Sequence, residues 1–128
     1  MGRIVAQVRV ENASDPSKSI LLDALVDTGA SHLVLPAAWR NRLGELTSLD
    51  TVELELATQE SATDEICGPV RIQIEGFRAI FGEVLFVEMH PVDGGYEPLL
   101  GYIALEQSLA AVDLVGHRLL RAKHFDLK

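Results

Sequence analysis

Apolar and polar residues alternate along much of the chain with a period of two, which is typical of strands that bury one face. The alternation runs through residues 4–10, 52–56, 70–74 and 77–81. Mostly apolar runs at 20–26, 33–35 and 84–87 predict strands that are buried more fully. Turn-forming residues, such as those at 12–18, separate these segments. The pattern therefore predicts a mostly β fold.

Two segments outside the predicted strands favour short helices. Residues 37–43 end at Gly44, and glycine commonly ends helices. Residues 102–109 carry apolar side chains at a helical spacing and predict a second short helix. The final stretch, residues 111–120, predicts a hairpin that turns near Gly116.

Length, charge and cysteine content narrow the class of protein. A chain of 128 residues that is 48% apolar has room for one hydrophobic core, so we expect residues 1–128 to form a single domain. The net charge of −8 argues against a nucleic-acid partner, because phosphate binding needs a basic surface. The apolar runs are too short to span a bilayer, and the first residues do not resemble a secretory signal, so no membrane partner is expected. The one cysteine, Cys67, cannot form an internal disulfide, which favours a cytoplasmic location.

The stretch 24–31 carries the strongest chemical signal. The apolar run that ends at Val26 leads directly into Asp27, and a second apolar run follows at 33–35. A carboxylate between two buried strands needs hydrogen-bond donors, because an unpaired buried charge is costly. Gly29 permits a tight turn whose backbone N–H groups point at that carboxylate. The pattern predicts one carboxyl group presented at the end of a strand, although a carboxylate that only caps the turn would leave the same pattern.

The motif Asp27-Thr28-Gly29-Ala30-Ser31 resembles the active-site signature of the aspartic proteases. With Ala after Gly, in a chain this short, it resembles the single-domain retroviral (retropepsin-like) type and its bacterial relatives. The resemblance covers nearly the whole chain and implies a mostly β, closed barrel or sandwich with a psi loop, one flap hairpin and one or two short helices. It assigns catalysis to Asp27 and the active-site loop to Thr28, Gly29, Ala30 and Ser31.

Two further segments take their expected roles from the same resemblance. Leu99, Leu100 and Gly101 correspond to the short strand of the psi loop, which lies across the strand that carries the catalytic aspartate. A glycine there lets two backbones approach closely. The hairpin between residues 52 and 74 corresponds to the flap, which covers a bound peptide. The flap residues expected to cover substrate are Thr58, Gln59, Glu60 and Ser61.

Aspartic protease chemistry needs two carboxyl groups that share one proton, one acting as base on water and the other donating a proton to the substrate carbonyl oxygen. The sequence contains only one Asp-Thr-Gly. The resemblance therefore implies that the second carboxylate is Asp27 of an identical chain across a two-fold axis. The expected protein is an aspartic-type endopeptidase, a hydrolase that acts as a homodimer on peptide or protein substrates and needs no metal or other cofactor.

Two alternatives stay open. A catalytically weak or inactive dimeric module of the same fold would bind peptides or act as a scaffold. The predicted flap tip contains no glycine, unlike the flaps of viral relatives, and this favours the binding module slightly. A protease domain cut from, or acting within, a larger pathway would carry the same motif.

Other reactive residue types give weaker signals. The four histidines, His32, His90, His117 and His124, lack the spacing of metal ligands, so no zinc site is expected. We expect His32 to be an exposed loop residue. Ser31 lacks the Gly-x-Ser-x-Gly context of a serine nucleophile. Cys67 has no basic neighbour in the sequence, which favours a small packing residue over a nucleophile.

Overall fold

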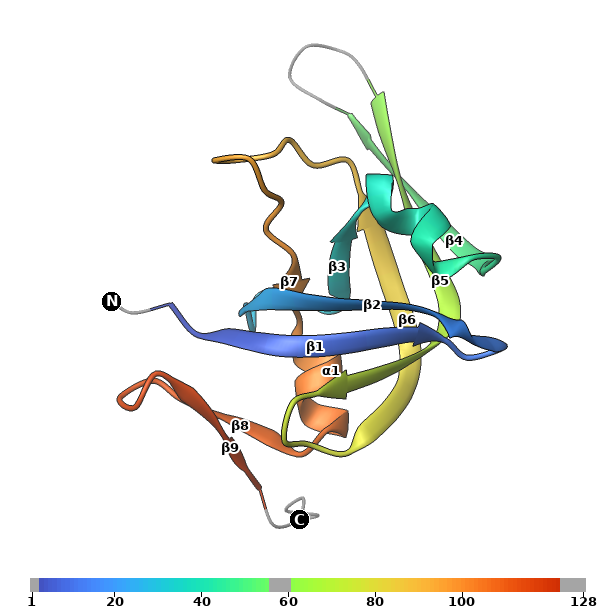
Figure 1. The fold of residues 1–128 in the computed structure, drawn as a ribbon. Helices are drawn as coiled ribbons and strands as arrows, with labels where there is room; N and C mark the ends of the chain where they lie inside the picture. The colour runs from blue at the N-terminus through green and yellow to red at the C-terminus, as the bar shows by residue number, and fades with distance from the viewer. Residues whose placement is uncertain (1–2, 56–60, 123–128) are drawn as a thin grey trace.

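The computed structural model describes residues 3–55 and 61–122, and within these ranges the chain is mostly β (Figure 1). The described residues form nine strands, one 3₁₀-helix (η1) and one α-helix. Their bounds, in chain order, are β1 Val5–Asn12, β2 Asp15–Val26, β3 Leu33–Pro36, η1 Ala37–Leu43, β4 Thr47–Glu55, β5 Ser61–Ile74, β6 Ala79–Val87, β7 Leu99–Leu100, α1 Tyr102–Gln107, β8 Ala110–Asp113 and β9 Arg118–Arg121.

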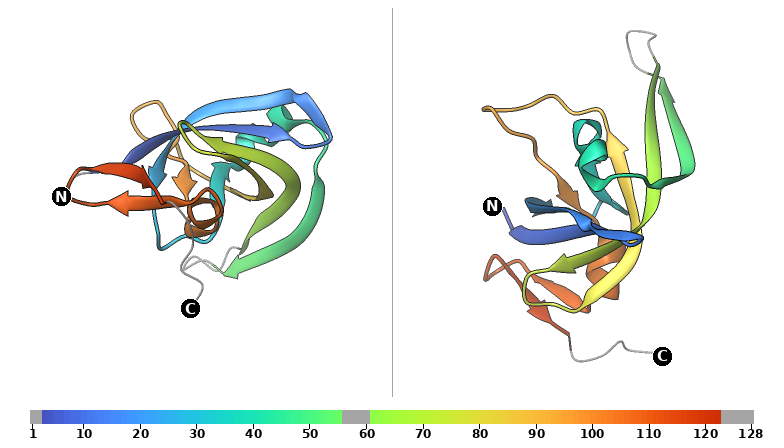
Figure 2. Two further views of the ribbon diagram at one scale, coloured as in Figure 1. Left: turned by 90° about the horizontal axis from the view of Figure 1, so that it is seen from below. Right: turned by 45° about the vertical axis from the view of Figure 1, so that its right-hand side comes forward.

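Among the described strands, six close into a barrel. Each pairs with the next in the order β1, β2, β7, β3, β6 and β5. The ring closes because β5 also pairs with β1, from Val8 opposite Ile74 to Asn12 opposite Val70. β4 pairs with the first part of β5, and the two strands extend together beyond the barrel, as the right-hand view of Figure 2 shows. The closed barrel confirms the fold class predicted from the sequence.

The alternation in the sequence matches the alternation of burial in the strands. In β1 the even-numbered side chains are buried, whereas the odd-numbered ones are exposed except Glu11, which is half-buried. β2 follows the same rule, with Ile20, Leu22 and Ala24 buried and Leu21 and Asp23 exposed. At the end of the strand the alternation of burial stops, and Leu25 and Val26 are both half-buried.

The turn between β1 and β2 is shorter than the sequence indicates. Residues 12–18 are all turn formers, yet only two residues separate the strands. Asn12, which is 3% exposed, stabilises this tight turn because its Oδ1 accepts the backbone N–H of Ser14 at 2.9 Å. Its Nδ2 donates to the carbonyl oxygens of Leu43 at 2.8 Å and Glu45 at 2.7 Å. One buried side chain thus makes the turn and fixes the end of η1 against the barrel.

The predicted flap hairpin is formed by β4 and β5, but both strands are longer than expected. β5 begins at Ser61, so residues 61–64 of the predicted polar tip belong to a strand. The backbone of these residues pairs with β4. This pairing makes them part of a strand, although their side chains do not alternate between apolar and polar. Asp64 is buried, and burial raises the pKa of its carboxyl group. Thr58, Gln59 and Glu60 lie outside the described residues.

A separate two-stranded sheet, β8 with β9, follows α1 and confirms the predicted final hairpin. The backbone N–H of Ala122 donates to the carbonyl oxygen of Leu109 at 2.7 Å, and Arg121 Nε donates to the carbonyl oxygen of Gly76 at 2.9 Å. These bonds connect the hairpin to the end of α1 and to the turn between β5 and β6. Within the described ranges, no helix has the length and apolar character needed to cross a membrane.

Candidate active site

Asp27 directly follows the last residue of β2, at the point where β7 joins the barrel. β7 runs parallel to β2, with Leu25 opposite Leu99 and Val26 opposite Leu100, and antiparallel to β3. The backbone N–H of Asp27 donates to the carbonyl oxygen of Leu100 at 3.0 Å. Two residues of a distant segment therefore hold the start of the Asp-Thr-Gly loop.

Gly101 brings the backbone after β7 into direct contact with the loop that follows Asp27. A Cβ atom on Gly101 would lie 2.6 Å from the carbonyl carbon of Ser31 and 2.7 Å from the carbonyl oxygen of Ala30. Immediately afterwards, the N–H groups of Tyr102 and Ile103 donate to the carbonyl oxygens of Ala30 and Ser31 at 2.9 and 3.2 Å. Only a residue without a Cβ allows the two backbones to come this close, so glycine is required at position 101.

The carboxylate of Asp27 is held by its own loop. The backbone N–H of Gly29 donates to Asp27 Oδ1 at 2.9 Å, and the N–H of Ala30 donates to the Asp27 carbonyl oxygen at 3.1 Å. Asp27 is half-buried, whereas Thr28 and Gly29 are exposed. The carboxyl group is therefore oriented by a hydrogen bond and still reaches solvent, in contrast to the fully buried charge that the flanking apolar runs suggest.

A pocket of about 430 Å³ lies beside β2 and β7, lined by one residue of each strand. Leu25 of β2 lines it and stands two residues before Asp27. The other lining residues are Met89, His90, Val92, Glu97 and Leu99. Glu97 also forms an ion pair with Arg3. The pocket is mostly apolar, with polar side chains only from His90 and Glu97.

Ser31 and His32 form a hydrogen-bonded chain with Glu83, which sequence reasoning did not single out. Ser31 Oγ lies 2.8 Å from His32 Nδ1, and His32 Nε2 lies 3.2 Å from Glu83 Oε1. The side chain of His32 is 19% exposed, so the expectation of an exposed loop histidine is wrong. All three residues line a cavity of about 180 Å³ between the loop, β6 and α1. In the sequence, the only sign of the contact between His32 and Glu83 is an acidic residue in the segment that forms β6. The two residues are 51 positions apart, so no local pattern links them.

Cys67 is fully buried in the core, as expected of a packing residue. The sequence shows no basic residue beside it, but the structure places Arg40 close to it, where Arg40 Nε also lies 3.1 Å from Glu65 Oε1. Burial raises the pKa of the Cys67 thiol, and the Arg40 guanidinium offsets this only in part. The thiol is thus protonated at neutral pH, which excludes an activated nucleophile.

We expect iodoacetamide to alkylate Cys67 at pH 8 at least about 100-fold more slowly in the native protein than in denaturant, because the thiol is both buried and protonated. Mass spectrometry over time measures both rates. The readout is unambiguous, since the sequence contains one cysteine. Similar rates in the two states would contradict the assignment of Cys67 to the core.

Of the four predicted flap residues, the structure describes only Ser61. Ser61 opens β5 opposite Glu55, and the other three predicted flap residues are outside the described ranges. In the part of the chain that the structure describes, no three His, Cys, Asp or Glu side chains gather in a way that could hold a metal ion.

Comparison with known proteins gives the family. Residues 6–102 match the family described as "Aspartyl protease", and this range runs from β1 to the first residue of α1. The chain belongs to the aspartyl protease family. Its fold is similar to that of the EIAV protease complexed with the inhibitor HBY-793, with a TM-score of 0.56 and 23% sequence identity over 83% of this chain and 88% of that chain. No curated protein matches the sequence. Family and fold together identify a retropepsin-like aspartic protease.

Proposed function

We propose that this protein is an aspartic endopeptidase that hydrolyses peptide bonds with a pair of Asp27 carboxyl groups, one from each of two identical chains. The observation that carries the proposal is the geometry of Asp27. Its carboxylate is oriented by the Gly29 N–H at the crossing of β2 and β7 and remains open to solvent. A carboxylate that merely capped a turn would not need a second segment, β7, to hold its backbone.

The proposed reaction needs two carboxyl groups at one site. The ionised one takes a proton from water, and the water oxygen bonds to the carbonyl carbon of the substrate. The protonated one gives its proton to the carbonyl oxygen, which forms a tetrahedral diol. Collapse of the diol breaks the C–N bond: one carboxyl group of the pair gives its proton to the leaving nitrogen, and the other takes a proton from a diol hydroxyl, which leaves a carboxylic acid and a singly protonated pair. Asp27 of each chain fills one role, since no other Asp-Thr-Gly occurs in the sequence.

The other loop residues support this pair in the proposal. Thr28 is exposed next to Asp27, where it can contact a second copy of the loop. Gly29 holds the carboxylate and presents its exposed backbone to the peptide. Ala30 and Ser31 are fixed from behind by the N–H groups of Tyr102 and Ile103. These hydrogen bonds hold the loop on its inner side, while Thr28 and Gly29 are exposed on the side that would face a partner.

The proposed substrate is a peptide or protein segment with an apolar side chain beside the cleaved bond. The pocket lined by Leu25 and Leu99 lies beside the strand that leads into Asp27, and its walls are mostly apolar. The predicted flap, whose strands are β4 and β5, would cover such a peptide. We place this activity in the cytoplasm, because Cys67 is a free thiol.

Cleavage of a diverse peptide pool from pH 3 to pH 7 tests the proposal. We expect cuts beside apolar residues with the native sequence and none with Asp27→Asn. If neither protein cuts although the native one is dimeric and binds peptides, the chain is a peptide-binding module and the proposed activity is wrong.

A further inference from the structure

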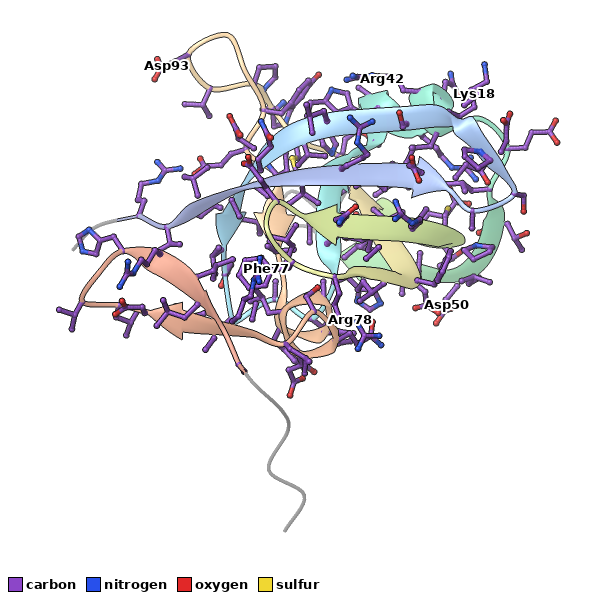
Figure 3. All side chains as sticks on the ribbon, turned by 60° about the horizontal axis from the view of Figure 1, so that its bottom comes forward. Lys18, Arg42, Asp50, Phe77, Arg78 and Asp93 are labelled. Carbon is purple, nitrogen blue, oxygen red and sulfur yellow. The ribbon has the colours of Figure 1, made fainter. Side chains whose placement is uncertain are left out.

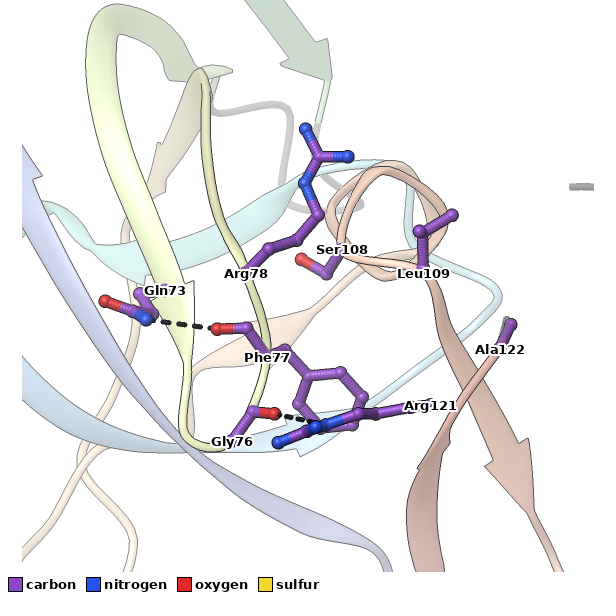
Figure 4. Close-up of a pocket in the computed structure, with 8 residues that line it drawn as sticks. All are labelled: Gln73, Gly76, Phe77, Arg78, Ser108, Leu109, Arg121 and Ala122. Carbon is purple, nitrogen blue, oxygen red and sulfur yellow. Dashed lines mark hydrogen bonds between the residues drawn. The ribbon is translucent and has the colours of Figure 1, made fainter. Parts of the chain in front are cut away.

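A second pocket, of about 470 Å³, has no residue of the Asp-Thr-Gly loop in its lining (Figure 4). Three segments far apart in sequence form it: the turn between β5 and β6, the end of α1 and the end of β9. Its volume is within the range of small-molecule sites, roughly 300–1,000 Å³. None of its lining residues belongs to the proposed catalytic machinery, so it calls for a separate explanation.

Ser108 is a polar side chain without a partner in this pocket. It is 2% exposed, and its Oγ makes no hydrogen bond in the part of the chain that the structure describes. Figure 4 shows the hydroxyl on the side of the helix end that faces Arg78 and Phe77. A buried hydroxyl that makes no hydrogen bond destabilises the fold. A ligand that accepts a hydrogen bond from Ser108 would remove that penalty.

Two arginines supply positive charge around the same pocket. Arg78 and Arg121 both line it, and neither forms an ion pair with another described residue. Arg121 uses Nε to reach the carbonyl oxygen of Gly76, which leaves its terminal nitrogens as donors. In a chain with a net charge of −8, two guanidinium groups that line one pocket favour an anionic ligand.

The remaining walls are apolar. Phe77, Leu109 and Ala122 line the pocket together with the two arginines, and the Phe77 ring lies between Ser108 and Arg121 in the view of Figure 4. An inorganic ion would leave this surface uncovered, whereas a ligand with an apolar portion would bury it. The pocket thus combines donors for oxygen atoms with a surface for hydrocarbon.

We propose that this pocket binds an oxyanion, a carboxylate or a phosphate ester, carried on an apolar body. Ser108 Oγ donates to one ligand oxygen, Arg78 and Arg121 supply the charge, and the apolar portion packs on Phe77 and Leu109. Bound ligand would join β6, α1 and β9 and so stabilise the C-terminal hairpin against the barrel. The site functions independently of whether Asp27 cleaves peptides.

Titration of the ¹⁵N-labelled protein with phenylacetate and with phenyl phosphate, at constant ionic strength, tests the site. We expect saturable shifts of the amide signals of residues 76–78, 108–109 and 121–122 with at least one of the two, and the tighter ligand identifies the kind of oxyanion. Inorganic phosphate should bind about tenfold more weakly, because it has no apolar portion. Arg78→Gln and Arg121→Gln should each weaken binding about tenfold.

Two further variants separate a binding site from a structural feature. Arg42→Gln removes the same charge from η1, which lies at the opposite end of the molecule from Arg78 in Figure 3, and should leave binding unchanged. Ser108→Ala should weaken binding yet raise Tm by about 2–4 °C, because it removes a buried hydroxyl that makes no hydrogen bond.

Three results would overturn the proposal. The first is the absence of saturable shifts with both aromatic anions. The second is equal weakening of binding by Arg42→Gln and Arg78→Gln, which would indicate unspecific attraction. The third is a lower Tm for Ser108→Ala, which would show that the hydroxyl is bonded within the fold.

Discussion

Asp27→Asn is expected to abolish peptide cleavage, with kcat reduced at least about 10³-fold, because an amide can neither accept a proton from water nor donate one to the substrate. The fold should persist. Asn keeps the shape of the side chain and an oxygen that can accept the Gly29 N–H, which donates to Asp27 Oδ1 at 2.9 Å. Cleavage of the preferred peptide from the pool, together with thermal unfolding of both proteins, measures the two effects.

Asp23→Asn is the matched control for this experiment. Asp23 is exposed and lies on β2, four residues before Asp27. The variant loses the same charge from the same strand and should keep full activity. Cleavage by Asp27→Asn at a rate close to that of Asp23→Asn would mean that Asp27 is not the reacting group.

Gly101→Ala is expected to lower the free energy of unfolding by about 3 kcal/mol, the upper end for an added methyl group in a packed site. The new Cβ would lie 2.6 Å from the carbonyl carbon of Ser31, and backbone atoms cannot move aside as a flexible side chain can. Any relief would shift β7 or the loop that holds Asp27, so cleavage activity should fall as well. Chemical denaturation measures the loss of stability.

Gly95→Ala provides the comparison for Gly101→Ala. A Cβ on Gly95 meets no described atom within 4 Å, and its φ lies outside the left-handed region. The change should alter stability by less than about 0.5 kcal/mol. If the two alanine variants unfold at the same denaturant concentration, the close approach at Gly101 does not hold the crossing together.

Local patterns in the sequence predicted most of the strands and the pairing of β7 with β2. Alternation identified β1 and the second half of β5, since a strand that buries one face must repeat every two residues. The motif at Asp27 and the resemblance it carries placed β7 next to β2. The first prediction uses only residues that are neighbours in the sequence, and the second uses a motif of a known family. Both kinds of information are present in a single sequence.

Features that depend on distant partners could not be predicted in this way. Residues 61–64 look like a loop but belong to β5, because backbone pairing with β4 needs no apolar side chain. The sequence predicts an exposed loop histidine at position 32. In the structure, His32 Nε2 lies 3.2 Å from Oε1 of Glu83, which is 51 positions away. Arg40 of η1 comes close to Cys67 and Glu65 of β5 only in the folded chain. In each case the fold decides which side chains meet.

Mixing experiments test most directly whether two copies of Asp27 form one active site. The native protein and Asp27→Asn are refolded together in equal amounts, and the cleavage rate is compared with that of the same total amount of native protein. If each site needs Asp27 from both chains, only about one quarter of the dimers are active and the rate falls to about one quarter. A rate of about one half would show that each chain works alone and would contradict the shared site.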